Sequence, residues 1–138
     1  MRKVYWVISM KLEVGMFIRT PLGIDKIIYL RIQDEYGCNY DTQLEHNLFL
    51  NNEKDYISID GECFEKEEIK ASYNIIDLIE EGDYVNGKQV TKLMIKMRDE
   101  QGVFGLPDVW KMYIEKIEVE SIVTKEQFES MSYKVKED

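Results

Sequence analysis

The sequence predicts a mainly β protein built from two tandem units of similar design, with one short helix at its C-terminal end. Residues 12–27 and 79–93 repeat one pattern: an apolar residue, a Glu, a Gly two positions later, a short strand, a tight turn and a second strand. Apolar and polar residues alternate in several of the other segments, as in half-buried strands. Asp60-Gly61 and Asn86-Gly87 are residue pairs that favour tight hairpin turns.

The first unit begins with two strands. Apolar residues alternate over residues 14–19, Pro21-Leu22-Gly23 predicts a turn, and a second alternation covers residues 28–32. Residues 33–54 are polar and rich in turn-forming residues, with a short apolar patch at residues 48–50. This composition predicts a long excursion from the unit.

A hairpin is predicted at residues 56–65. Asp60-Gly61 fits the two positive-φ positions of a type I′ turn, whose twist matches that of paired strands. The resulting register places Ile57 opposite Phe64 and Ser58 opposite Cys63.

The second unit repeats the hairpin signal. Asn86-Gly87 joins residues 83–85 to residues 88–90. Alternating side chains over residues 92–98 then predict a further strand, with Leu93, Ile95 and Met97 on one side.

The chain closes with a strand and a helix. A strand from Trp110 onward breaks near Glu115-Lys116, where the parity of the apolar residues changes. Thr124 and Gln127 have the spacing of a capping box, which predicts a helix start. Residues 67–78 parallel residues 118–127, so the boundary is predicted near residue 77, with one unit at 1–77 and the other at 78–138.

Each unit resembles a small SH3-like barrel, because a strand with the apolar-Glu-x-Gly pattern followed by tight turns is typical of such barrels. The resemblance implies two tandem SH3-like barrels. A closer resemblance lies in residues 74–87 (Asn-Ile-Ile-Asp-Leu-Ile-Glu-Glu-Gly-Asp-Tyr-Val-Asn-Gly) and 121–135 (Ser-Ile-Val-Thr-Lys-Glu-Gln-Phe-Glu-Ser-Met-Ser-Tyr-Lys-Val). These segments resemble parts of small, mostly uncharacterised proteins carried by phages and prophages of Gram-positive bacteria. That resemblance implies a mobile-element setting and a role against host machinery, as in an anti-CRISPR inhibitor, and it supplies no catalytic residues.

Charge is spread unevenly along the chain, whose net charge is −9. Residues 1–32 carry six Lys/Arg and two Asp/Glu, residues 33–82 carry three and fourteen, and residues 83–138 carry nine and eleven. The middle block, at −11, would repel a phosphate backbone. Two interpretations stay open for it: a solubilising surface, or an acidic face for a basic partner.

The sequence predicts a cytoplasmic protein of the bacterial host. No apolar run approaches the roughly 20 residues that span a bilayer. Residues 1–9 are too short for a signal peptide, and they form either an extension before a start at Met10 or an edge strand. Cys38 and Cys63 give no disulfide framework, as expected in a reducing compartment.

Catalytic and metal-binding patterns are weak. His46 is the sole histidine, lies in the polar excursion and has no Gly-x-Ser-x-Gly motif to serve, so we expect an exposed loop residue. Cys38, Asp41, His46 and Cys63 could in principle surround zinc, but they lack a Cys-x-x-Cys pair. The sequence therefore predicts a protein that is not an enzyme and needs no cofactor.

Two surfaces remain as candidates for binding. The first is the acidic stretch at residues 55–68, where carboxylates and aromatic rings could occupy a groove meant for nucleic acid; its candidate residues are Asp55, Tyr56, Glu62, Phe64, Glu65, Glu67 and Glu68. An alternative is that its aromatic residues are ordinary core. The second surface is a cationic stripe, Lys88, Lys92, Lys96 and Arg98, on the second unit.

These observations favour a non-catalytic protein that binds a host protein, such as a CRISPR effector or another nucleic-acid-binding complex, through its acidic surface. The runner-up is a small β-barrel that binds nucleic acid or takes part in transcription through the cationic stripe. A scaffold or oligomerisation module is the third hypothesis.

Overall fold

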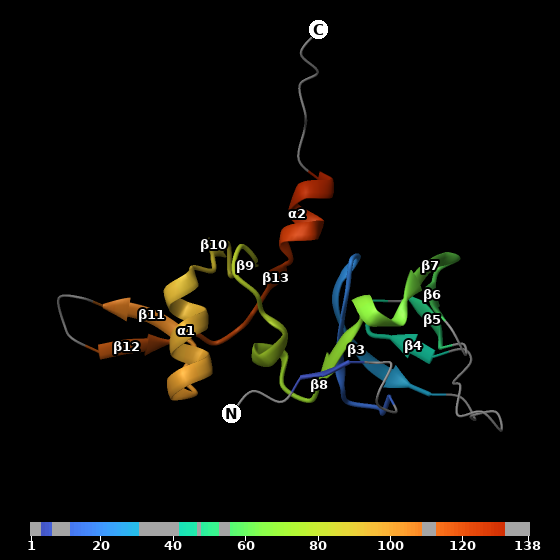
Figure 1. Cartoon of the computed structure of the whole chain (residues 1–138), viewed down its shortest axis with the longest axis horizontal. Helices are drawn as coiled ribbons and strands as arrows, with labels where there is room; N and C mark the ends of the chain where they lie inside the picture. Colours follow the sequence, from blue (N-terminus) through green and yellow to red (C-terminus); the bar gives the residue numbers. More distant parts are fainter. Residues whose placement is uncertain are drawn as a thin grey trace, which may run out of the picture. The chain divides into compact units, whose positions relative to one another are not determined.

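The computed structural model describes residues 4–6, 12–30, 42–46, 48–52, 56–108 and 113–131, and this part of the chain is mainly β (Figure 1). The chain divides into two compact units. The N-terminal unit comprises Lys3–Thr20 and Ile24–Leu78. The C-terminal unit comprises Ile79–Asp138 together with Met1–Arg2 and Pro21–Gly23.

An antiparallel sheet that curls into half a barrel forms most of the N-terminal unit (Figure 1). Its eight strands lie in the order β1-β8-β2-β3-β4-β5-β6-β7. They are β1 (Tyr5–Trp6), β2 (Phe17–Thr20), β3 (Gly23–Tyr29), β4 (Thr42–Leu44), β5 (Phe49–Asn52), β6 (Tyr56–Ile59), β7 (Glu62–Glu65) and β8 (Lys70–Ser72). The 3-10 turns η2 (Lys66–Glu68) and η3 (Ile75–Leu78) flank β8.

The core of this unit lies on one face of the sheet. Alternate residues point inward, so the strands β4, β5 and β6 contribute Leu44, Leu50, Ile57 and Ile59, all with at most 1% exposure. Other members of the same cluster are Leu12, Met16, Ile18, Ile27, Phe64, Ile69 and Ala71.

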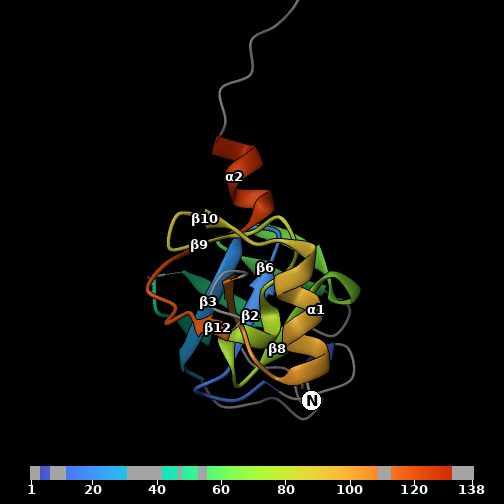
Figure 2. The ribbon, with the colours of Figure 1, turned by 90° about the vertical axis from the view of Figure 1, so that its left-hand side faces the viewer.

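The C-terminal unit combines two small sheets with two helices. A three-stranded sheet has the order β10-β9-β13, from β9 (Tyr84–Val85), β10 (Lys88–Gln89) and β13 (Ile122–Val123). A hairpin pairs β11 (Gly105–Asp108) with β12 (Tyr113–Lys116). The helices are α1 (Lys92–Gln101) and α2 (Lys125–Met131), and α1 lies against β11, beside the hairpin in Figure 2.

The mainly β class is confirmed, but the expectation of two tandem SH3-like barrels with one helix is wrong. The N-terminal unit is an open, curled sheet, and the C-terminal unit is divided between a three-stranded sheet, a hairpin and two helices. Two units of such different strand number cannot be copies of one barrel.

The repeated sequence pattern does fold twice into the same local structure. In the first copy Met16 N–H donates to Glu13 O, Gly15 N–H to Ile27 O, and Ile27 N–H to Met16 O. This is a tight turn followed by a β-bulge with a glycine of positive φ, 95° at Gly15.

The second copy has the same hydrogen bonds at equivalent positions. Asp83 N–H donates to Glu80 O, Gly82 N–H to Val90 O, and Val90 N–H to Asp83 O, with φ of 93° at Gly82. The repeat is therefore a turn–bulge motif shared by two otherwise different units.

Two further sequence signals are confirmed. Asn86 and Gly87 adopt φ of 52° and 80° in the turn between β9 and β10. At the start of α2, Gln127 N–H donates to Thr124 Oγ1 (3.2 Å) and Thr124 N–H to Gln127 Oε1 (2.9 Å), which completes the capping box. The Phe128 ring stacks on Tyr84 with centroids 4.5 Å apart, which holds α2 against β9.

Two segments differ from expectation. Residues 92–98 are helical in α1, which begins at the N-cap Thr91 and ends at Gly102, with φ of 70°. Residues 33–54 include β4 and β5, two inner strands of the large sheet. The part of this excursion at residues 33–41 lies outside the described residues.

At the N-terminus, Tyr5 and Trp6 form the edge strand β1, which pairs with β8. Among the described residues, no helix is long and apolar enough to cross a bilayer.

Candidate functional site

The hairpin β6–β7 is shaped by a type I′ turn and anchored by a buried pair. Asp60 and Gly61 have φ of 49° and 84°, as the sequence predicts. Ile57 lies opposite Phe64 and Ser58 opposite Cys63, in the predicted register. Because Ile57 and Phe64 both lie in the core, alternate residues of the two strands must face solvent.

The hairpin tip is also tied to the neighbouring strand. Phe49 N–H donates to Asp60 Oδ1 (3.1 Å), and Asp60 N–H donates to Phe49 O (3.1 Å). One carboxylate of the acidic stretch therefore serves the turn itself.

The other described carboxylates of this stretch form an exposed group that we call the acidic edge: Glu62, Glu65, Glu67 and Glu68. The first two lie on β7, the last strand of the sheet, and the other two lie on η2. Within the described part of the chain, none of the four makes an ion pair. Uncompensated carboxylates gathered at one edge produce a negative potential that attracts a basic ligand.

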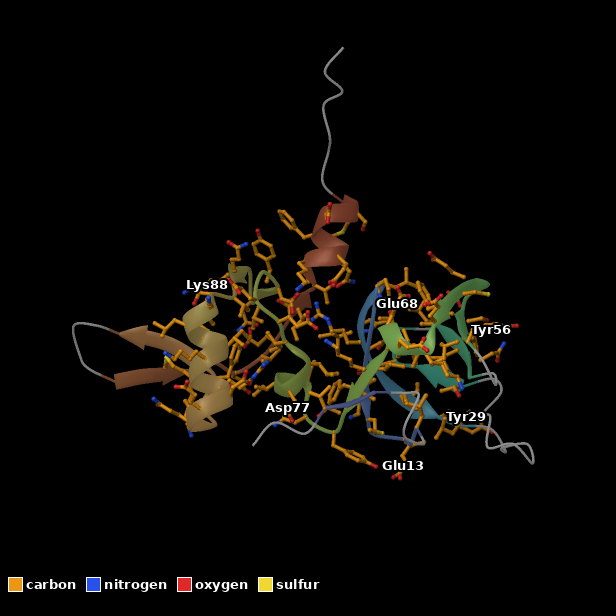
Figure 3. All side chains as sticks on the ribbon, viewed as in Figure 1. Glu13, Tyr29, Tyr56, Glu68, Asp77 and Lys88 are labelled. Atoms are coloured by element: carbon orange, nitrogen blue, oxygen red, sulfur yellow. The ribbon has the colours of Figure 1, made fainter. Side chains whose placement is uncertain are left out.

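The remaining predicted site residues have different positions. Tyr56 is exposed and lies opposite Glu65, so its ring borders the acidic edge; Figure 3 labels both Tyr56 and Glu68 on the N-terminal unit. Phe64 is only 8% exposed and packs in the core, so it supports the hairpin from beneath. Asp55 lies outside the described residues.

His46 is exposed, as expected, but a buried carboxylate orients it. His46 Nδ1 lies 2.8 Å from Asp25 Oδ1, and His46 N–H donates to Asp25 Oδ2 (3.3 Å). The hydrogen bond and the negative charge of Asp25 raise the pKa of His46 above its usual 6.5.

A histidine held through Nδ1 by a carboxylate is the pairing that orients a general base. Among the described residues, however, nothing is hydrogen-bonded to His46 Nε2. No spacing pattern in the sequence marks this pair, since Asp25 is 21 positions away on β3.

The four residues considered for zinc are not brought together within the described chain. Cys38 and Asp41 lie outside the described residues. Cys63 is a free, exposed thiol on β7, whereas His46 is bound to Asp25. Where the structure is described, no three His, Cys, Asp or Glu side chains form a metal-binding group.

The cationic stripe is broken by its last member. Lys88, Lys92 and Lys96 are exposed on β10 and α1. Arg98 is 4% exposed; its guanidinium donates to Ile79 O and to Asp99 Oδ1. Arg98 is thus a structural residue of the C-terminal unit.

Comparison of the chain with protein-family models, curated proteins and solved structures found no match. The candidate site therefore depends on its own geometry and charge.

Proposed function

We propose that this protein is a non-catalytic inhibitor that binds a basic protein of a bacterial host through the acidic edge. The observation that carries the proposal is the group of four exposed carboxylates that lack a cation partner among the described residues. A protein groove that binds nucleic acid presents Lys and Arg to phosphates, so carboxylates at similar spacing can occupy it. The proposed target is a nucleic-acid-handling defence complex, as for anti-CRISPR inhibitors. The resemblance of residues 74–87 and 121–135 to phage proteins supports this setting.

The test is affinity purification from a Gram-positive host lysate, followed by competition with nucleic acid. We expect a nucleic-acid-binding protein to co-purify, and added oligonucleotide to release it. Reversal of the acidic edge (Glu62→Lys, Glu65→Lys, Glu67→Lys and Glu68→Lys) should abolish its recovery.

A charge-matched control separates the site from net charge. Four exposed carboxylates of the C-terminal unit can be reversed in the same way: Glu81, Glu100, Glu118 and Glu120. This control should retain the partner. Equal loss in both variants, or retention in both, would overturn the acidic edge as the site.

Binding of nucleic acid by the C-terminal unit is the second candidate. Lys92 and Lys96 are one helical turn apart on the exposed side of α1, which gives phosphates two adjacent cations. This second candidate predicts that the protein retards labelled RNA or DNA in a gel and that added salt weakens the effect. The double variant Lys92→Gln, Lys96→Gln should abolish the retardation. Absence of retardation at low salt would eliminate this candidate.

A further inference from the structure

The exposed face of the large sheet carries aromatic rings beside the acidic edge. Tyr29 lies opposite Gln43, and Gln43 lies opposite Phe49, so these three side chains form a row across β3, β4 and β5. A β-bulge between Ile27 and Tyr29 shifts the register, which keeps Ile27 in the core and turns Tyr29 to the exposed face. Neighbouring strands are about 4.8 Å apart, so roughly 10 Å separates the backbones at the two aromatic positions.

The same face extends along β6 toward the acidic edge, and Tyr56 lies at the other end of that strand from Phe49, whose neighbour is Asp60. Asn51 lies opposite Ser58 on the same face, and Tyr56 lies opposite Glu65. We call this surface the aromatic face, with six members: Tyr29, Gln43, Phe49, Asn51, Tyr56 and Ser58. In Figure 3, Tyr29 and Tyr56 lie on the same side of the N-terminal unit.

All three rings are exposed to solvent. Tyr29, Phe49 and Tyr56 are 55%, 53% and 39% exposed. Two of them have a carboxylate beside them, since Tyr56 pairs with Glu65 and Phe49 N–H is bonded to Asp60. Rings next to carboxylates, with amide and hydroxyl groups between them, match a ligand that is both cationic and planar.

We propose that the aromatic face binds an arginine-rich segment of the same partner that contacts the acidic edge, an inference that rests on the proposed function. A guanidinium can stack on a ring and donate hydrogen bonds in its own plane to carboxylates and amides, whereas a lysine ammonium cannot stack in this way. Nucleic-acid bases would also stack on the rings, but their phosphates would lie against Glu65 and the acidic edge.

The test uses two labelled nonapeptides in which glycine alternates with arginine or with lysine. Fluorescence anisotropy at low salt should give roughly three- to tenfold tighter binding of the arginine peptide. Combined Tyr29→Leu, Phe49→Leu and Tyr56→Leu substitutions keep apolar area but remove the rings. This variant should bind the arginine peptide no more tightly than the lysine peptide. Tyr56→Leu alone repeats the comparison with the smallest change to the sheet.

Controls separate the possible outcomes. Tyr73→Leu removes an exposed ring in the bend after β8 and should preserve the arginine preference. Equal affinity for both peptides, with or without the rings, would overturn the aromatic face and leave the acidic edge standing. Failure of both peptides to bind would overturn the proposed function as well. Ring-dependent binding of oligothymidylate, or ring-dependent self-association, would assign the face to another ligand and overturn the inference.

Discussion

Two carboxylates, Asp25 and Asp83, are buried and accept main-chain N–H groups, which distinguishes them from those of the acidic edge. Asp25 accepts from Lys26 N–H (2.8 Å) and from His46 N–H (3.3 Å). Asp83, with no exposure, accepts from Glu80 N–H (2.7 Å) and Lys125 N–H (2.9 Å). These acids hold turns together and are not available to a partner, whereas the acids of the acidic edge are exposed.

His46 should make the stability of the N-terminal unit depend on pH. Asp25 raises the pKa of His46 in the folded state. The pair therefore stabilises the folded unit to its full extent below about pH 6.5, the usual histidine pKa. The stabilisation should fall as the pH rises through the higher folded pKa. Because the side chain is 75% exposed, the effect should stay below about 1 kcal/mol.

Urea unfolding between pH 5 and pH 8 measures this effect. The His46→Asn variant should show a flatter dependence of unfolding free energy on pH than the unmodified protein. Parallel curves for the two proteins would show that the pair of His46 and Asp25 does not contribute to the pH dependence of stability.

Substitution of Asp83 should loosen the start of α2. One carboxylate oxygen accepts the partly buried N–H of Glu80 and the other that of Lys125, and an asparagine can replace only one acceptor. Asp83→Asn should therefore cost about 1–3 kcal/mol. Hydrogen exchange should show faster exchange at residues 125–128 than in the Glu126→Gln control, whose substitution lies in the same helix. Unchanged protection would mean that the capping box alone fixes the helix start.

The turn–bulge motif is the element that the two units share, and its glycines test it. Gly15 and Gly82 have nearly equal φ. A Cβ added at Gly15 would meet nothing within 4 Å, and one added at Gly82 would make an ordinary contact with Lys125 at 3.6 Å. The backbone conformation, not crowding, should then set the cost of alanine. We expect Gly15→Ala and Gly82→Ala to destabilise by similar amounts, about 1–2 kcal/mol each by chemical denaturation. A cost confined to one glycine would show that the two copies are not equivalent.

Elements coded by local residues could be predicted from the sequence. The Asp60-Gly61 and Asn86-Gly87 turns, the hairpin register and the Thr124 capping box each depend on a few adjacent side chains. The repeat could also be found, but it predicts a turn and a bulge rather than a barrel, because strand number depends on the rest of each unit.

The alternation of apolar and polar residues predicts neither the helix α1 nor the inner strands β4 and β5. In α1, alternating Leu93, Ile95 and Met97 imitate a strand, yet Thr91 and Gly102 are helix-capping residues at its two ends. Here the N-cap partner is Met94, whose sulfur accepts from Thr91 N–H (3.5 Å) in place of the usual Glu or Gln. The short, partly polar strands β4 and β5 are stabilised by pairing within the large sheet.

The candidate site was predictable in composition but not in geometry. The acidic stretch is visible in the sequence, and so is the exposure of alternate residues on its hairpin. The burial of Phe64, the partnership of Asp25 with His46 and the meeting of Tyr29 with Phe49 require strand pairing between distant segments. In particular, the bulge that exposes Tyr29 has no local sequence signal.

At the scale of the whole molecule, negative charge is concentrated in the middle of the chain. Residues 33–82 carry three Lys/Arg against fourteen Asp/Glu. Like charges held close together oppose folding, and a protein retains such a cost where the charges serve binding. The acidic edge should therefore decrease stability in the absence of a partner.

Neutralising the acidic edge tests this argument without any knowledge of the partner. The variant Glu62→Gln, Glu65→Gln, Glu67→Gln and Glu68→Gln should unfold at a higher temperature at low salt, by on the order of 2–5 °C, because repulsion is relieved. Added salt should reduce the difference, since it screens exposed charges. Neutralising Glu81, Glu100, Glu118 and Glu120 should have a smaller effect, because the last three lie in residues 83–138, where nine Lys/Arg nearly balance eleven Asp/Glu. A lower melting temperature in the first variant would mean that these carboxylates support the fold, and would remove the reason to regard them as a binding surface.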